Sequence, residues 1–556
     1  MAVCIRTLAR LLYLGVAIVA ANIRDTHAVR LGQATVVGTV DGAVEKFLGI
    51  PFAQPPIGQL RYRLPRLLDS YNGTVDATSL GSQCFQQTAS GGPSASDIPP
   101  QILLGLATLN TLFAFNSSVP QSEDCLNLNI LRPVNVSADV QLPVLFWIHG
   151  GGFATGSNAI PSYNGTAIVQ RSIDIGEPVI FVGVNYRLNV FGSLGGQEVK
   201  DAGVGNLGLH DQRTALCWVQ KFISSFGGDP KKVTIWGESA GSASVFLQLF
   251  ANNGNAEGLF RAGIMSSGSS NPTGDITDLQ HTYDFVVQQV GCGNATDSLA
   301  CLRTASTESL RAAASKAGPQ AVRGYKGLAS SPWVPHADGV FVEQSPQELA
   351  AHGKAADVPF IIGDTQDEGT LFSLANLNIT TEPELASYLQ AFWFPGASSS
   401  DIKALLKLYP ADPEAGSPFK TGNANAFTPE YKRIAAIQGD FFQAARRNVL
   451  DRLSSTHTAY NFLSARHFLS GLGYSHATDL FNVFGPGDMT DYFIRFVRHL
   501  NPNDNSGVQW PRFETSSRLT LQFIDGDTPL NVAADTERLA ATRALFELGR
   551  FTWKDE

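Results

Sequence analysis

The chain contains no dense run of lysine and arginine. Its 40 basic residues are outnumbered by 49 acidic ones among 556, and the formal net charge is −9. Proteins that bind nucleic acids gather positive charge on one face or along one segment. The absence of such a segment excludes nucleic acid as a partner.

Apolar runs long enough to cross a membrane, which takes about 20 residues, are also missing. The N-terminal stretch Met1–Arg10 carries two arginines, and the apolar run that follows it, Leu11–Ala21, is too short for a span. A basic segment before a short apolar one is typical of a secretory signal peptide. We expect a signal peptide within residues 1–28, cleaved after Ala21 or after Ala28, and a secreted chain without a membrane anchor.

Linker-like tracts, internal repeats and low-complexity segments are absent, apart from a loose Gly/Ser/Pro stretch at 90–100. Hydrophobic residues make up 44% of the chain and charged residues only 16%, which is typical of a globular protein and not of a disordered one. A chain of this length buries a large core. We therefore predict a single folded domain over residues 29–556.

Cysteines are few, and an odd number remains once the signal peptide removes Cys4. Cys292 and Cys301 bracket a short loop, which a disulfide closes at little entropic cost. Cys217 lies in a helical pattern and has the character of a buried hydrophobic residue. The remaining two are Cys84 and Cys125. Six sequons predict N-glycosylation on surface loops of a secreted protein, at Asn72, Asn116, Asn135, Asn164, Asn294 and Asn378.

Short apolar runs alternate with helical patterns along most of the chain. The alternation predicts an α/β fold with a large, mostly parallel central sheet and helices on both faces. The expected strands are Val144–Ile148, Val179–Val184, Val233–Trp236, Ala262–Met265, Phe360–Ile362, Ala459–Phe462 and Leu519–Phe523. The expected helices are Asp211–Phe222, Ser242–Phe250, Thr282–Val290, Ser400–Leu408 and Tyr431–Leu453.

The pentapeptide Gly237–Gly241 is the chain's one match to the G-x-S-x-G nucleophile elbow. An ordinary glycine turn is the alternative, but the context favours the elbow, because a strand pattern precedes it and a helix pattern begins at Ser242. The hydroxyl of Ser239 then sits at a helix N-terminus, where backbone amides stabilise a developing oxyanion. We predict Ser239 as the nucleophile.

A second glycine motif, His149–Phe153, follows the strand pattern Leu142–Ile148. Turns of this HGGG type offer backbone amides to the oxyanion that forms when serine attacks an ester carbonyl. The expected donors are the amides of Gly151, Gly152 and Ala240. A flexible glycine loop without a catalytic role is the alternative.

The acid and the base of a triad should follow the serine in that order. After the strand at 360–362 the chain offers Asp364, Asp367 and Glu368, and spacing does not separate Asp367 from Glu368. His476 stands out as the base because small residues surround it in the loop 471–477. Three further histidines lie downstream of the acid, namely His457, His467 and His499.

These motifs together resemble the type-B carboxylesterase family, which includes the cholinesterases, and within it the secreted fungal lipases and sterol esterases. The resemblance runs from about Gly38 to the C-terminus. Besides the two glycine motifs it rests on Phe47–Ala53, Glu123–Leu128, Asn185–Arg187, Asp211–Arg213, Phe226–Pro230, Asp367–Thr370, Tyr409–Phe419 and Thr428–Arg433.

The resemblance implies an α/β-hydrolase fold in which the glutamate of the Asp-Glu-Gly motif is the triad acid. That residue is Glu368 here, and the family's histidine falls at His476. The family's disulfides imply pairing of Cys84 with Cys125 and of Cys292 with Cys301, with Cys217 free. The segment 84–125 then corresponds to the disulfide-closed lid of the fungal lipases.

The lid segment contains a nearly continuous apolar stretch at 98–115. A lid covers the site in water and swings towards lipid at an interface, whereas the alternative is a helix packed permanently in the core. No tryptophan lies between Cys84 and Cys125, although the cholinesterases that the chain resembles carry one there, which disfavours choline esters.

We expect, in sum, a secreted carboxylic-ester hydrolase without metal or cofactor that acts on hydrophobic esters, at a lipid–water interface, as a lipase or sterol esterase. Smaller soluble or aryl esters are the alternative substrates, and a non-catalytic, cholinesterase-like adhesion module is the alternative of another class. Phe153, Leu371 and Phe372 are the expected substrate-binding residues. Activity should fall below roughly pH 6, where a histidine base takes up a proton.

Overall fold

The structure is a computed structural model that describes residues 26–87, 98–114, 116–271, 273–321, 331–423, 427–504 and 506–552. Most of the predicted signal peptide, and the part of the predicted lid at 88–97 and 115, lie outside these residues. No helix of the described part is long and apolar enough to cross a membrane.

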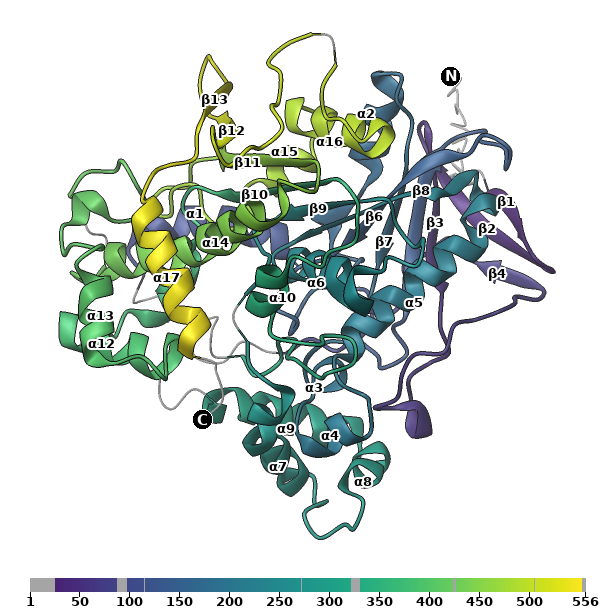
Figure 1. Ribbon diagram of the computed structural model, residues 1–556. Helices are drawn as coiled ribbons and strands as arrows, with labels where there is room; N and C mark the ends of the chain where they lie inside the picture. Colours follow the sequence, from purple (N-terminus) through teal and green to yellow (C-terminus); the bar gives the residue numbers. More distant parts are fainter. Residues whose placement is uncertain are drawn as a thin grey trace, which may run out of the picture.

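One continuous sheet runs through the molecule (Figure 1). Its strands follow the order β1-β2-β3-β5-β7-β6-β8-β9-β10-β11-β12-β13, and β4 pairs with β2. The strands are β1 Thr26–Leu31, β2 Ala34–Asp41, β3 Val44–Pro51, β4 Thr74–Asp76, β5 Asn127–Pro133, β6 Leu142–Ile148, β7 Ile180–Val184, β8 Gly228–Glu238, β9 Ala262–Ser266, β10 Phe360–Thr365, β11 Ala459–Ala465, β12 Leu519–Ile524 and β13 Leu530–Ala534.

The sheet is mixed, with a parallel centre and mostly antiparallel margins. Strands β7, β6, β8, β9, β10, β11 and β12 pair in parallel, so all seven strands expected from the sequence belong to the parallel part. The margins are antiparallel, with β1, β2, β3, β5 and β7 on one side and β12 with β13 on the other, apart from the short β4, which pairs with β2 in parallel. Short turns join several of these outer strands, and such turns suffice only between antiparallel neighbours.

The helices cover both faces of the sheet (Figure 1). The five helices expected from the sequence are all present. The helices are α1 Pro100–Phe113, α2 Thr166–Asp174, α3 Asn189–Gly192, α4 Gln197–Asp201, α5 Leu207–Phe222, α6 Ala240–Gly254, α7 Gln280–Gln289, α8 Ser298–Thr304, α9 Thr307–Ala321, α10 Pro346–His352, α11 Gly369–Ser373, α12 Glu382–Tyr388, α13 Ser399–Leu406, α14 Tyr431–Leu453, α15 Leu480–Val483, α16 Asp488–His499 and α17 Leu539–Thr552.

Alternate side chains of β6 point to two separate parts of the core. Phe146 and Ile148 pack in a cluster with residues of α5 and α6, whereas Leu145 and Trp147 pack in a second cluster with residues of α2 and α16. All four are fully or nearly fully buried. A strand that is buried on both faces reads as a continuous apolar run, which is why β6 was recognisable in the sequence.

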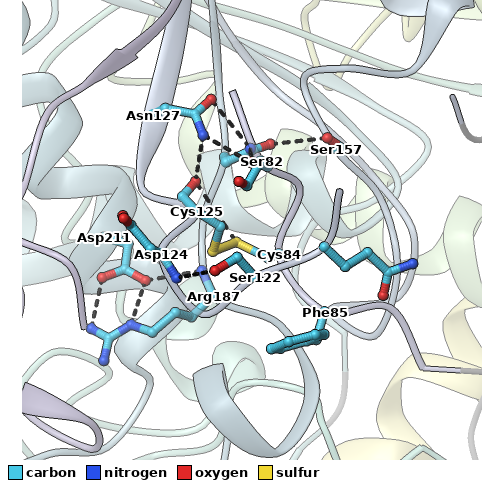
Figure 2. The surroundings of a disulfide bond; sticks show 12 residues. Ser82, Cys84, Phe85, Ser122, Asp124, Cys125, Asn127, Ser157, Arg187 and Asp211 are labelled. Carbon is cyan, nitrogen blue, oxygen red and sulfur yellow. Dashed lines mark hydrogen bonds and ion pairs between the residues drawn. A yellow bond between two sulfur atoms is a disulfide. The ribbon is translucent and has the colours of Figure 1, made fainter. Parts of the chain in front are cut away.

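The described residues contain two disulfides, and both join the expected cysteines. The bond Cys84–Cys125 joins cysteines 41 positions apart, and Cys292–Cys301 joins cysteines 9 positions apart, while Cys217 is free. Figure 2 shows the first bond beside Asn127, whose amide donates to the carbonyl oxygens of Ser82 and Cys125. Both ends of the predicted lid segment are therefore attached to the start of β5.

Helix α1 is the one helix in the described part of that segment. Ile102, Leu109 and Leu112 are buried in the second core cluster, whereas Leu103 is 39% and Leu104 72% exposed. The helix lies against the segment 469–471, because a Cβ at Gly105 would meet the carbonyl oxygen of Ser470 at 2.8 Å. One side of α1 is thus packed in the core and the other presents leucines to solvent.

Candidate active site

Ser239 occupies a sharp turn between β8 and α6. Its φ is +57° and its ψ −121°, outside both the helical and the strand regions, and its N–H donates to the carbonyl oxygen of Ser266 at 2.9 Å. Glycines on either side make the turn possible. A Cβ at Gly237 would lie 2.2 Å from the backbone of Gly241, and one at Gly241 would lie 2.0 Å from the oxygen of Ile148. This is the strand-turn-helix context that a nucleophile elbow requires.

The three candidate carboxylates, Asp364 near the end of β10 and Asp367 and Glu368 in the turn after it, have three different partners. Asp364 accepts a hydrogen bond from the guanidinium of Arg446 at 2.7 Å. Asp367 accepts from the backbone N–H of Tyr474 at 2.9 Å. Glu368 alone reaches a histidine, because its Oε2 lies 2.5 Å from Nδ1 of His476. The geometry thus separates Asp367 from Glu368, which spacing could not.

The four candidate histidines also differ in the groups that they contact. Nε2 of His457 lies near a backbone carbonyl oxygen, and Nε2 of His467 near the amide oxygen of Asn482. His499 lies 3.0 Å from Glu177, but its side chain is half exposed. His476 is buried beside Glu368, in the loop between β11 and α15.

The far edge of the His476 ring faces the elbow. Its Nε2 lies 3.2 Å from Oε1 of Glu238, the residue that precedes Ser239, although the two groups are not aligned as a hydrogen bond. The imidazole therefore lies between Glu368 on one side and the turn of Ser239 on the other. A base in this place can take a proton from a serine hydroxyl and can be oriented by the carboxylate behind it.

Buried carboxylates surround this imidazole. Burial lowers the pKa of His476, but the charges of Glu368 and Glu238 outweigh it and hold the pKa above its ordinary value of 6.5. Burial also raises the pKa of Glu238 above the usual range of a carboxyl group, and that of Asp479 to about 7. The oxygens of Glu238 and Asp479 have no hydrogen-bond partner within the described part of the chain.

The second glycine motif lies beside the elbow. A Cβ at Gly150 would meet the Cβ of Ser239 at 3.0 Å, so the loop after β6 runs close to the side chain of Ser239. Gly151 and Gly152 have φ of +109° and +60°, which only glycine adopts without strain. Ala240 is the first residue of α6, and its amide belongs to the helix N-terminus. The three expected oxyanion donors therefore belong to two segments that meet at Ser239.

The three expected substrate-binding residues lie in different surroundings. Phe372 is half-buried, and its ring centroid is 4.8 Å from that of His476. Leu371 is a partly buried neighbour of the second core cluster. Phe153 is buried, with its ring edge-on to that of Tyr186 at 6.4 Å. Of the three, Phe372 is the one whose ring packs against a predicted triad residue, His476.

Three residues near the site were not identified from the sequence. Phe442 on α14 stacks on Phe372 at 5.6 Å, and its ring lies 5.2 Å from that of His476. No local sequence pattern identifies Phe442 as a site residue, because tertiary packing alone decides which face of α14 meets the site. Glu238 and Asp479 carry a weak signal, since each is an acidic residue within three positions of a predicted triad member.

Comparison with known proteins places this arrangement in a family. A sequence model described as the carboxylesterase family matches residues 25–459. Lipase 2 of Diutina rugosa is 40% identical and covers 96% of this chain and 98% of its own. Secreted triacylglycerol lipase LIP1 of Gibberella zeae is 39% identical and covers 88% of this chain and 85% of its own.

A solved structure shares the fold. The crystal structure of Aspergillus niger EstA matches with a TM-score of 0.77 and 26% identity, over 95% of this chain and 99% of that one. The elbow, the glycine loop and the long sheet are therefore parts of an α/β-hydrolase fold. On the match over residues 25–459 and relatives of about 40% identity along most of its length, the chain belongs to the carboxylesterase family, and it is an enzyme that hydrolyses carboxylic esters.

Proposed function

We propose that this enzyme is a secreted lipase or sterol esterase, which hydrolyses long-chain, lipid-like esters through an acyl-enzyme formed on Ser239. The observation that carries the mechanism is the position of His476. Its Nδ1 lies 2.5 Å from Glu368, and its Nε2 lies 3.2 Å from the residue that precedes Ser239.

The first half of the reaction forms the acyl-enzyme. Nε2 of His476 takes the proton of the Ser239 hydroxyl while the hydroxyl oxygen attacks the ester carbonyl carbon. The carbonyl oxygen becomes an oxyanion, which the amides of Gly151, Gly152 and Ala240 stabilise. When the intermediate collapses, the bond to the alcohol breaks, and the alcohol leaves with the proton from the imidazole.

The second half repeats the same steps with water. His476 takes a proton from water, the hydroxide attacks the acyl carbonyl carbon, and the carboxylic acid leaves as Ser239 recovers its proton. Glu368 orients the ring and stabilises the imidazolium in both halves. Its other oxygen, Oε1, accepts the N–H of Thr365 at 2.6 Å, so this carboxylate has a fixed direction.

Two observations support lipid-like substrates. Relatives at about 40% identity are named as lipases, one of them as a triacylglycerol lipase. Helix α1 exposes Leu103 and Leu104 while its other side lies against 469–471, in the same loop as His476. A helix so placed uncovers more apolar surface if it swings away, and a lipid interface favours that movement.

A substrate panel tests the proposed class. p-Nitrophenyl esters of increasing acyl length, a sterol ester and a triglyceride emulsion are compared below and above the solubility limit of each substrate. A lipase or sterol esterase with a moving lid gains rate steeply once an interface forms. Equal rates on both sides of the limit, with a preference for short soluble or aryl esters, support the alternative substrates and contradict the lid.

Secretion rests on separate observations. One relative of 41% identity, from Botryotinia fuckeliana, is named secreted lipase 1. Strand β1 begins at Thr26, and His27 within it lies 2.7 Å from Glu45, so cleavage after Ala21 leaves β1 whole while cleavage after Ala28 removes part of it. We favour Ala21. N-terminal sequencing of the secreted enzyme identifies the site.

Glycosylation can be tested on the same secreted material. Five of the six sequon asparagines are exposed, namely Asn72, Asn135, Asn164, Asn294 and Asn378, and Asn116 is half-buried. Exposed acceptors are the ones that the glycosylation machinery reaches. Removal of N-glycans by an amidase should lower the apparent mass, and peptide mapping should find modified asparagines within this set.

A further inference from the structure

Asp367 directly precedes the triad glutamate, but its buried carboxylate binds other segments. Oδ1 accepts the hydroxyl of Ser417 and the N–H of Phe419, both at 2.8 Å. Oδ2 accepts the N–H of Tyr474 at 2.9 Å. The backbone N–H of Asp367 also donates to the carbonyl oxygen of Tyr474 at 2.9 Å. One aspartate thus joins three stretches that lie far apart in the sequence.

Tyr474 lies two residues before His476, so these bonds act on the loop that carries the base. The loop is fitted closely to the carboxylate. Gly473 has a φ of +63°, and a Cβ there would lie 2.4 Å from Oδ2 of Asp367. The hydroxyl oxygen of Thr370, at the start of α11, lies 2.8 Å from the carbonyl oxygen of Leu472 and fixes the same loop from the next turn.

From these contacts we infer that Asp367 is a positioning residue for the base. Glu368 holds the imidazole ring, and Asp367 holds the backbone two residues before the ring. Because the two acids are neighbours on one turn, a shift of the loop relative to Asp367 also changes the distance between Nδ1 of His476 and Oε2 of Glu368. The inference rests on the proposed triad and gives a role to the acid that the triad leaves unused.

The substitution Asp367→Asn tests this with little change in volume. An amide has one oxygen and one NH2 group, whereas Asp367 accepts N–H donors at both oxygens, so either orientation places a donor against a donor. The loop must shift. A misplacement of about 1 Å costs roughly a hundredfold in rate, so kcat should fall by up to that factor. KM for a short ester should change little.

The pH profile gives a second readout. His476 faces the carboxylates of Glu368, Glu238 and Asp479. If the ring moves away from Glu368, it loses part of the charge that raises its pKa, and the acidic limb of kcat/KM should move to lower pH. A residue that only stabilises the fold would lower the yield of folded enzyme without moving this limb.

Asp440 provides the matched control. It is an equally buried aspartate on α14, which accepts the hydroxyl of Tyr409 at 2.9 Å and the guanidinium of Arg538 at 2.8 Å. The change Asp440→Asn should lower the melting temperature but leave kcat and the pH limb of the folded enzyme unchanged. A second test variant, Gly473→Ala, keeps the aspartate and pushes the loop away from it.

The experiment compares the full-length wild type, Asp367→Asn, Gly473→Ala and Asp440→Asn. The readouts are the pH profile with p-nitrophenyl butyrate and the downfield proton resonance of the His476 Nδ1–H, which a strong bond to a carboxylate produces. We expect the resonance and the pH limb to move in the first two variants only. Unchanged resonance and pH limb in both overturn the inference. The wild type separates this outcome from a failure of the proposed triad. If the triad is wrong, an organophosphate does not label Ser239 in the wild type, whatever the variants show.

Discussion

Nδ1 of His476 lies 2.5 Å from Oε2 of Glu368, although 108 residues separate the two in the chain. Both side chains are buried. Two parallel neighbours in the sheet bring them together, because Glu368 follows β10 and His476 follows β11, and the carboxyl ends of parallel strands share an edge. The relationship is therefore a product of the sheet and not of local sequence.

Replacement of Glu368 by glutamine should abolish most of the activity. The amide keeps the shape of the side chain but favours the wrong tautomer of His476, and the corresponding change in a serine protease triad lowers kcat about 10⁴-fold. The measurement is kcat on a soluble p-nitrophenyl ester. The exposed Glu547→Gln serves as the control and should match the wild type. A loss of less than about tenfold contradicts the role of Glu368.

Replacement of Glu238 by glutamine should shift the pH dependence. The base works only when unprotonated, so kcat/KM rises with pH through the pKa of His476, which the structure places above its ordinary value. The limb of the wild type should therefore lie above the pH of roughly 6 expected for an unperturbed histidine. Without the charge of Glu238 that pKa falls, and the acidic limb moves to lower pH.

A pH profile of kcat/KM for the wild type and Glu238→Gln checks this sign. Superimposed profiles, or a shift to higher pH, contradict the prediction, because they mean that the charge of Glu238 does not raise the pKa of His476.

Replacement of Gly151 by alanine should lower kcat by as much as the loss of one oxyanion donor does. A Cβ there would lie 2.3 Å from the carbonyl oxygen of Thr155, so the loop must move away from Ser239. Loss of one such donor lowers kcat about 10²- to 10³-fold. Gly176 is the control, since its φ is also positive but open space surrounds it. Gly176→Ala should cost only about 1 kcal/mol of stability and no activity.

Replacement of Asp535 by asparagine should destabilise the fold. The buried carboxylate pairs with Arg446 at 3.0 Å and with Arg447 at 2.5 Å. Removal of one partner of a buried ion pair costs about 3–5 kcal/mol, whereas the exposed pair of Asp69 with Lys221 is worth about 1 kcal/mol at most. Thermal unfolding of Asp535→Asn and Asp69→Asn at neutral pH compares the two.

The destabilisation should also depend on pH. Burial raises the pKa of Asp535, but Arg446 and Arg447 outweigh it and hold the pKa below its ordinary value of 3.8. A depressed carboxyl pKa contributes stability that is present above the unfolded-state value and is lost as the pH falls through the folded-state value. The gap in melting temperature between wild type and Asp535→Asn should therefore shrink below about pH 4. A constant gap contradicts the charge argument.

The sequence predicted the centre of the fold far better than its margins. Strands such as β6 are buried on both faces and read as apolar runs. The outer strands β3 and β5 contain Glu45 and Arg132, which pair with each other across the sheet, so charged residues interrupt the apolar pattern there. An ion pair between strands is invisible until both strands are placed.

The candidate site likewise has a part that local sequence predicts and a part that depends on long-range packing. The elbow and the glycine loop are local, because their glycines are required by contacts within a few residues or with a neighbouring strand. The choice between Asp367 and Glu368 depends on which carboxylate points at a loop more than a hundred residues away, and only the assembled sheet decides that. The resemblance to a family supplied this choice before any geometry did.

Covalent labelling of Ser239 tests the central claim most directly. The wild type and Ser239→Ala are treated with an organophosphate, the modified peptide is identified by mass spectrometry, and ester hydrolysis is measured on the same samples. The account predicts one label on the peptide 237–241 of the wild type, and loss of both label and hydrolysis in the variant. Labelling at another residue, or hydrolysis that survives in Ser239→Ala, would contradict it.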